Sequence, residues 1–325
     1  MKSSPVVHQE AKPFVRKQLK GKRPLILNDR VKAFLCLLPS IILIMVFVYG
    51  FIGWTGYVSL SNWNSLVPDF SFAGLKNYAF LFNDYRFQAD LRNTLFFTLF
   101  FIIAVLASGL LLAILLDQKI RGESLFRNIF FFPMALSFIV TGVVWQWLLN
   151  PSTGVNLLLK KFGMSPLWYT SVKVIPGVEW GKIEFGVPVA IIAVVIAAMW
   201  QMTGFSLAMY LAGLRGIPEE LREAARMDGA SELQVYTKII LPLLMPITVS
   251  VIIIMAHISL KIFDLIYAMT GPGANFVTDV PGMYMFETTF RGNYYANGAA
   301  ITIIMLLSVA IFIVPYLISS RKGGS

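Results

Sequence analysis

Few residues in this 325-residue sequence could bind a metal ion or act in covalent catalysis. Cys36 is the single cysteine, and His8 and His257 are the two histidines. They lack the paired spacing of zinc ligands, so neither a metal site nor a disulfide within the chain is expected. No G-x-x-x-x-G-K-[ST] sequence occurs, so we expect no P-loop for nucleotide phosphates. The sequence therefore predicts no catalytic residue, no metal and no cofactor in this chain.

Polar side chains within apolar stretches are the next candidates, because such residues are costly in a membrane and often mark a transport pathway. Gln146 lies beside Trp145, and Gln201 lies near Trp200 and Ser206. Amides and aromatic rings together suit the hydroxyl groups and ring faces of a polyhydroxylated solute. Helix–helix contacts and anchoring at the membrane interface explain the same residues equally well.

A second polar group comprises His257, Lys261 and Asp264, which share one stripe if the segment is helical. At about 1.5 Å per residue, Lys261 and Asp264 fall near one face of the membrane. Asp264 and Tyr267 are candidates for the wall of an external vestibule. The alternative is an ion pair between Lys261 and Asp264 at the membrane interface. The vestibule hypothesis predicts that Asp264→Ala reduces transport without loss of assembly.

The elements that position these residues are predicted to be membrane helices, since 57% of the chain is hydrophobic and 14% is charged. A helix crosses the hydrocarbon core with about 20 apolar residues. The apolar stretches are continuous and do not alternate, which favours an all-α bundle of six helices over a β-barrel. We expect a tail over residues 1–32 and a transmembrane domain over residues 33–320. The expected spans are residues 33–60, 93–116, 129–149, 187–214, 243–270 and 300–319, the fifth interrupted by two charges.

Lys and Arg concentrate on one side of this topology: in the tail, in the loops after the second and fourth spans, and at the C-terminus. Positively charged loops stay in the cytoplasm, so both termini and the loop over residues 215–242 are expected there. The net charge of +10 then reflects orientation and contact with anionic lipid, and no nucleic-acid partner is expected. The first span is too long for a signal peptide and is expected to be an uncleaved anchor.

The loop between the fourth and fifth spans carries the strongest local signals. Pro218 suits the first position of a helix, and the acidic residues after it complement the positive helix end. Gly229 can end that helix, and Ser231 can cap a second one. We therefore expect two short helices joined at a glycine, in which Ala224 and Ala225 form a low face that another protein can approach.

The residues of this loop resemble the EAA motif found in permease subunits of ABC importers. The match extends from Glu223-Ala224-Ala225 through Gly229 and Ile239 to Leu241-Pro242. In that family the segment is a coupling helix that docks in a cleft of a cytoplasmic ATPase subunit. The resemblance implies that Glu223 pairs with a basic residue of the ATPase and that Gly229 allows the sharp turn. The implied ATPase-coupling residues are Glu223, Ala224, Ala225, Asp228, Gly229, Leu241 and Pro242.

Three further segments, residues 60–78, 145–151 and 263–273, resemble permeases of the carbohydrate (maltose/glycerol-phosphate) type. Two departures stand out. The glycine run at residues 271–273 is short, and the extra N-terminal helices and large periplasmic insertion of the maltose-type subunit are missing. The resemblance therefore implies the compact six-helix form, a binding-protein-dependent permease for a sugar or polyol.

The resemblance also implies a complex in a bacterial inner membrane. Its parts are this chain and a second permease subunit, expected as a heterodimer, two cytoplasmic ATPase subunits that bind ATP and Mg²⁺, and a soluble binding protein that delivers the sugar. Tyr284, Asn293 and Asn297 are candidates for contact with the binding protein, because aromatic and amide side chains suit a transient interface. Anchoring at the membrane interface explains these residues as easily.

Three alternatives remain at this point. The same family could import glycerol phosphate or another small solute, although a phosphate would favour a more cationic cavity than these spans provide. An ion-gradient-driven transporter would favour midplane carboxylates or a pair of interrupted spans, and no such pair stands out. An intramembrane enzyme would need a nucleophile and a base that the sequence lacks.

Overall fold

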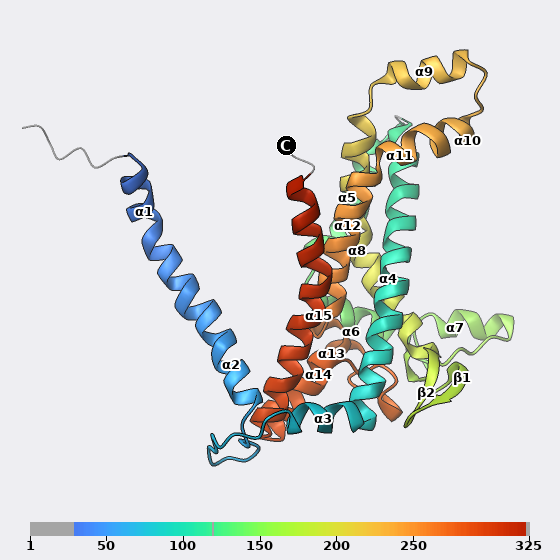
Figure 1. The fold of residues 1–325 in the computed structure, drawn as a ribbon. Coiled ribbons are helices and arrows are strands. Elements are labelled where there is room, and N and C mark those ends of the chain that lie inside the picture. Colours follow the sequence, from blue (N-terminus) through green and yellow to red (C-terminus); the bar gives the residue numbers. More distant parts are fainter. Residues whose placement is uncertain (1–28, 119, 323–325) are drawn as a thin grey trace, which may run out of the picture. The chain divides into compact units, whose positions relative to one another are not determined.

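The computed structural model describes residues 29–118 and 120–322 as a mainly helical chain (Figure 1). The chain divides into two units, residues 1–52 and 53–325. In the first unit, helix α1 (Asp29–Ile44) continues through a π-helical segment (Met45–Gly50) into the start of α2 (Phe51–Ser59). The helical stretch Val31–Ser59 is long and apolar enough to cross a membrane, as predicted for the first span.

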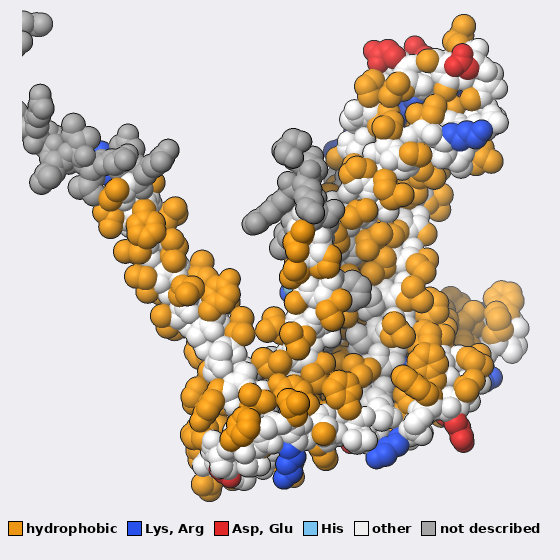
Figure 2. Space-filling view, in the orientation of Figure 1, with side chains coloured by type: hydrophobic (Ala, Val, Ile, Leu, Met, Phe, Trp, Pro, Cys, Tyr) orange, Lys and Arg blue, Asp and Glu red, His pale blue; other side chains and the backbone are white. Residues whose placement is uncertain are grey.

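The second unit is a helical bundle with a small sheet. Figure 2 shows apolar side chains over the sides of its helices and charged side chains toward its two ends. Its helices are α3 (Lys76–Asn83), α4 (Tyr85–Asp117), α5 (Glu123–Phe131), α6 (Phe138–Leu148), α7 (Asn156–Leu159), α8 (Val189–Arg215), α9 (Glu219–Met227), α10 (Glu232–Val235), α11 (Leu241–Leu243), α12 (Met245–Leu260), α13 (Asp264–Met269), α14 (Pro281–Phe286) and α15 (Tyr295–Lys322). Short 3-10 or π-helical segments lie at Phe132–Ala135, Lys160–Phe162, Trp168–Thr170, Tyr236–Ile240, Ala274–Phe276 and Glu287–Arg291.

Four helices of the described chain are long and apolar enough to span a membrane, or six if each of two bent pairs counts as one span. The second and fourth predicted spans are single helices, α4 and α8, and α4 begins earlier than predicted. The structure is therefore a mainly helical bundle with helices suited to a membrane, and two of its predicted spans differ from straight helices.

The third and fifth predicted spans are broken helices, although each was expected to be one span and no pair of interrupted spans was expected. Helices α5 and α6 meet at an angle of 103°. Pro133 lies in the turn between them and lacks an N–H for the helix ladder, while the Ser137 hydroxyl accepts from the N–H of Val140 and starts α6. In the fifth span, the axis bends by 63° before α12, and α12 ends before α13 restarts at Asp264.

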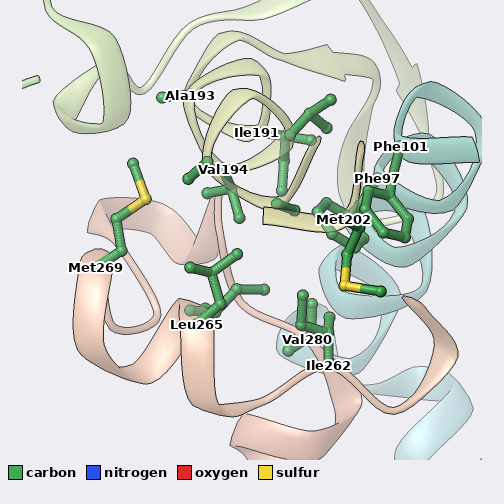
Figure 3. Packing of buried hydrophobic residues seen from close by; sticks show 14 of the residues in the cluster. Phe97, Phe101, Ile191, Ala193, Val194, Met202, Ile262, Leu265, Met269 and Val280 are labelled. Atoms are coloured by element: carbon green, nitrogen blue, oxygen red, sulfur yellow. The ribbon is translucent and has the colours of Figure 1, made fainter. Parts of the chain in front are cut away.

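The core of the second unit forms where α4 and α8 pack along each other (Figure 3). Phe97 and Phe101 of α4 stack with ring centroids 5.4 Å apart. They belong to one buried cluster with Ile191 of α8 and with Leu265 and Met269 of α13. This cluster holds the broken fifth span against the two long helices.

An antiparallel hairpin of β1 (Val174–Trp180) and β2 (Ile183–Pro188) precedes α8. Gly181, with a φ of +64°, supplies the left-handed turn between the strands. This hairpin was not predicted from the sequence. It lies at the end of the bundle opposite α9 and α10 (Figure 1).

Candidate functional site

The predicted coupling loop forms two short helices joined at a glycine, as expected. Gly229 follows α9 with a φ of +84°, a conformation that side chains other than glycine rarely adopt. The Ser231 hydroxyl caps α10 by accepting from the N–H of Gln234 at 3.4 Å, and the Gln234 side chain accepts from the N–H of Ser231 at 2.8 Å. Pro218 was predicted to be the first helical residue of α9, but it is the residue before the helix.

One side of α9 faces outwards. Glu223, Ala224 and Asp228 are exposed, and Met227 is 88% exposed. Ala225 is instead buried among the ends of the bundle helices, so the two alanines do not form one face. Met227 adds a flexible apolar side chain to this exposed, largely acidic side. Figure 2 shows the acidic side chains at this tip of the molecule.

The end of the loop is also accessible. Leu241 and Pro242 lie in α11, and both are exposed. The bend into α12 follows directly, so a displacement of this segment acts at the start of the broken fifth span.

The structure separates the amide and aromatic candidates for a solute pathway. Gln146 is exposed on α6. Trp200 is half-buried, and its ring meets that of Trp145 edge-on at 5.9 Å, which joins α6 to α8. Gln201 is 3% exposed, and its Nε2 donates to the carbonyl oxygen of Leu136 at 2.7 Å. Gln201 thus satisfies a carbonyl that the α5–α6 break leaves outside a helix.

Ser206 lies at the crossing of α4 and α8. A Cβ atom added to Gly109 would lie 2.4 Å from the Cβ of Ser206, so the two backbones approach closely. The Ser206 hydroxyl is fully buried, and no hydrogen-bond partner for it occurs within the described residues. Ser206 therefore occupies a helix–helix contact.

The predicted stripe of His257, Lys261 and Asp264 does not form, because α12 ends before Lys261 and α13 begins at Asp264. Lys261 and Asp264 are both exposed, and the described ion pairs do not include one between them. The predicted interface ion pair is therefore wrong. Tyr267 is 45% exposed, and its hydroxyl accepts from Nη2 of Arg291 at 3.4 Å.

The three residues predicted to contact a binding protein lie at the end of the bundle opposite α9. Tyr284 and Asn297 line a cavity of about 600 Å³ together with Arg86, whose guanidinium lies 4.6 Å from the centre of the Tyr284 ring. Burial raises the pKa of the Tyr284 hydroxyl. The N–H of Asn297 donates to Oδ1 of Asn64 at 3.0 Å, and Asn293 is half-buried with a φ of +59°.

A buried polar network that was not predicted from the sequence lies at the start of α4. Arg86 Nε lies 2.5 Å from Asp279 Oδ2, and Arg86 Nη2 lies 2.7 Å from Glu287 Oε2. Asn93 donates to the backbone oxygen of Asp279 at 2.8 Å. Asp90 is fully buried, and its carboxyl oxygens have no hydrogen-bond partner among the described residues. Burial raises the pKa of Asp279, against the opposing effect of Arg86.

The spacing of these residues could have revealed the network. The predicted second span began at residue 93, which left Arg86 and Asp90 in a loop. Arg86, Asp90 and Asn93 recur at i, i+4 and i+7, so extending the helix by two turns places all three on one face.

These features define a membrane protein with several apolar helices, two of them interrupted, and an exposed helical hairpin at one end of the bundle. Residues 106–322 match the family described as the binding-protein-dependent transport system inner membrane component. The chain belongs to this family and is a permease of the ABC importer class.

Relatives match most of the chain. A probable ABC transporter permease protein of Pyrococcus horikoshii is 40% identical over 293 residues, which cover 89% of this chain and 95% of the relative. The xylose/arabinose import permease protein of Haloferax volcanii is 34% identical over 290 residues, covering 87% and 86%. The trehalose/maltose transport system permease protein of Thermococcus litoralis is 31% identical over 286 residues, covering 87% and 92%.

A solved structure shares the fold. The bacterial ABC transporter that imports the acidic polysaccharide alginate contains a chain with a TM-score of 0.72 and 21% identity, covering 91% of this chain and 97% of that one. A bacterial alginate ABC transporter in complex with an alginate pentasaccharide-bound periplasmic protein also matches, with a TM-score of 0.73 and 21% identity. The overall fold described above therefore occurs in a solved importer.

Proposed function

We propose that this chain forms part of the translocation pathway of an ATP-driven importer that carries a sugar or polyol across a bacterial inner membrane. The names of the relatives support a sugar as cargo, because they include importers of pentoses and of disaccharides. The cavity beside Tyr284 and Asn297 adds support, since it combines an aromatic ring, amides and a neutralised Arg86–Glu287 pair.

In this proposal the chain pairs with a second permease subunit as a heterodimer and meets two ATPase subunits on the cytoplasmic side. These subunits bind ATP and Mg²⁺, and Glu223 pairs with a basic residue of one of them. Lys and Arg are more numerous in the tails and loops expected on the α9 side than in the loops on the other side, which supports a cytoplasmic location for this end. The C-terminal end of α15 lies at the same end of the bundle (Figure 1), in agreement with a cytoplasmic C-terminus.

At the other end, a soluble binding protein delivers the solute to the cavity lined by Tyr284 and Asn297, with Asn293 in the contact surface. The complex of the alginate importer with a loaded periplasmic protein supports a partner of this kind. Aromatic and amide side chains suit such an interface, because they combine apolar contact with hydrogen bonding.

The single observation that carries the proposal is the exposure of Glu223 on a helix at one end of the bundle, within a family-matched segment. The test is purification and reconstitution of the complex with Glu223→Lys. We expect the variant to assemble in the membrane but to lose the ATPase subunits and ATP-dependent uptake. Glu179→Lys is the matched control for ATPase binding, because Glu179 is an exposed acid on the hairpin at the opposite end. Normal transport by Glu223→Lys would contradict the proposal.

The cargo needs its own measurement. Uptake by proteoliposomes is compared for labelled xylose, arabinose, maltose, trehalose and glycerol 3-phosphate, with and without ATP inside. A sugar is expected to give the highest ATP-dependent uptake. Preference for glycerol 3-phosphate would overturn the sugar as cargo but retain the importer, whereas uptake driven by an ion gradient without ATP would overturn both.

A further inference from the structure

Helix α9 is attached to the bundle through few of its side chains. Ala225 is its single buried residue and belongs to a cluster with Val235, Ile240 and Leu244 of its own loop and with residues from the ends of α4 and α8. Arg222 lies three residues earlier and therefore on the same side of the helix. The bundle-facing side of α9 thus carries one small apolar residue and one long cation.

Arg222 joins three helices. Its Nη1 lies 2.9 Å from Oδ2 of Asp117, the last residue of α4, and its Nη2 donates to the carbonyl oxygen of Leu214 in the last turn of α8 at 3.2 Å. The Arg222 and Asp117 side chains are only 11% and 10% exposed, so water screens this pair less than a surface pair. The planar guanidinium can hold both acceptors in fixed directions, which a lysine ammonium cannot.

A cavity of about 470 Å³ lies beside this ion pair, between the end of α4, α9 and the segment after α10. Arg226 and Glu232 line the cavity and pair with each other at 2.7 Å, so their contact stays within the loop. The loop is therefore not tightly packed against α4 on this side, and Arg222 bridges the gap to Asp117.

The two helices that Arg222 contacts are packed against each other. Gly109 of α4 and Ser206 of α8 touch at the crossing, and Phe97 and Ile191 share one core cluster further along. Close-packed interiors transmit displacement, because side chains have little room to yield. A shift at the α9 end of α4 and α8 is therefore carried into the bundle.

We propose that Arg222 is the positioning residue through which a displacement of α9 reaches α4 and α8. This inference rests on the proposed function, in which an ATPase subunit moves α9. Arg222 holds the end of α4 by charge and the end of α8 by a backbone carbonyl, while Ala225 supplies the apolar contact. Glu223 binds the partner from the exposed side of α9, and Arg222 converts that binding into movement of the two long helices.

The test uses the complete importer in proteoliposomes, with the labelled sugar that wild type takes up best from the panel above. Three quantities are measured: ATPase subunits bound per permease, ATP hydrolysed, and sugar transported per ATP. The variants are Arg222→Met, Arg222→Lys and the charge swap of Asp117→Arg with Arg222→Asp. Arg226→Met is the matched control, because Arg226 is an exposed arginine of the same helix whose partners lie within the loop.

We expect Arg222→Met to bind the ATPase and hydrolyse ATP, with transport per ATP reduced about fivefold or more, the usual size of coupling between sites. Arg222→Lys should transport an amount of sugar per ATP between those of wild type and Arg222→Met, because lysine retains the positive charge but lacks the planar guanidinium. The charge swap should transport more sugar per ATP than Arg222→Met. Arg226→Met should transport as much sugar per ATP as wild type.

The proposal would be overturned if Arg222→Met transported as much sugar per ATP as wild type. It would also be overturned if Arg226→Met lost as much transport per ATP as Arg222→Met. Loss of ATPase binding in Arg222→Met would also overturn it, because Arg222 would then shape the docking surface itself. A wild-type complex without ATP-dependent uptake would instead contradict the proposed function, so the two failures are distinguishable.

Discussion

At the scale of single residues, Gly229 shows how one backbone angle shapes the exposed loop. Its φ is +84°, and an added Cβ would meet no atom within 4 Å, so a substitution is opposed by conformation and not by space. Gly229→Val should destabilise the turn by about 1–2 kcal/mol, and Gly229→Asn by less. The measurement is hydrogen exchange of the loop amides together with recovery of the ATPase subunits on purification.

The matched control for Gly229 is Gly216→Ala in the same loop. Gly216 has a φ of −81°, which alanine adopts without strain, and its nearest contact for an added Cβ is 3.4 Å. Equal effects of Gly229→Val and Gly216→Ala would show that the left-handed turn is not what the loop requires.

Gln201 is expected to stabilise the break between α5 and α6. Replacing it by Leu leaves the Leu136 carbonyl without its donor in an apolar surrounding, which costs about 1–3 kcal/mol. Thermal unfolding of the purified complex should therefore begin at a lower temperature in Gln201→Leu. Gln146→Leu is the control for stability, since Gln146 is exposed, and an equal decrease in both variants would refute this role of Gln201.

Sequence spacing located the residues of the coupling loop but not the surroundings of the polar candidates. Gly229 and Ser231 act through local backbone chemistry, which neighbouring residues specify. Ser206 and Gln201 were pathway candidates because they are polar residues in an apolar span. Their contacts with Gly109 and Leu136, which are distant in sequence, could not be predicted and are visible only in the packed structure.

At the scale of elements, the crossing of α4 and α8 depends on a small residue at position 109. A Cβ there would lie 2.3 Å from the Ser206 hydroxyl oxygen, so Gly109→Ala must push the helices apart or distort them. Overpacking of this kind costs about 1–3 kcal/mol. We expect a lower unfolding temperature for Gly109→Ala and recovery in the double variant with Ser206→Gly. If the double variant unfolds at no higher temperature than Gly109→Ala, the strain lies elsewhere.

The long helices were predictable from the sequence, whereas the interruptions were not. Apolar content alone identifies α4 and α8, because a membrane helix needs only length and hydrophobicity. The 103° turn between α5 and α6 depends on Pro133 and on a hydrogen-bond donor supplied by α8, so a search for continuous apolar stretches does not detect it. The short alternating strands of the hairpin carry a weaker signal than any span.

At the scale of the whole molecule, the two ends of the second unit are built differently. At the α9 end, the loop is attached through Ala225 and Arg222 and borders a cavity. At the opposite end, Arg86 connects α4 to Asp279 and Glu287 on either side of α14. This difference suits a permease in which the α9 end receives a displacement and the other end holds the helices together.

Arg86 therefore has a measurable stabilising role at the end opposite α9. Arg86→Met leaves the Asp279 carboxylate buried without its cation, which costs about 3–5 kcal/mol. The unfolding temperature of the purified complex should fall by roughly 5–10 °C. Arg291→Met is the matched control, because Arg291 pairs with the same Glu287 at 3.3 Å but is 59% exposed, and it should change stability by under about 1 kcal/mol. Adding Asp279→Leu to Arg86→Met should recover part of the loss, since it removes the stranded charge. If Arg86→Met and Arg291→Met unfold at the same temperature, the buried network does not hold this end together.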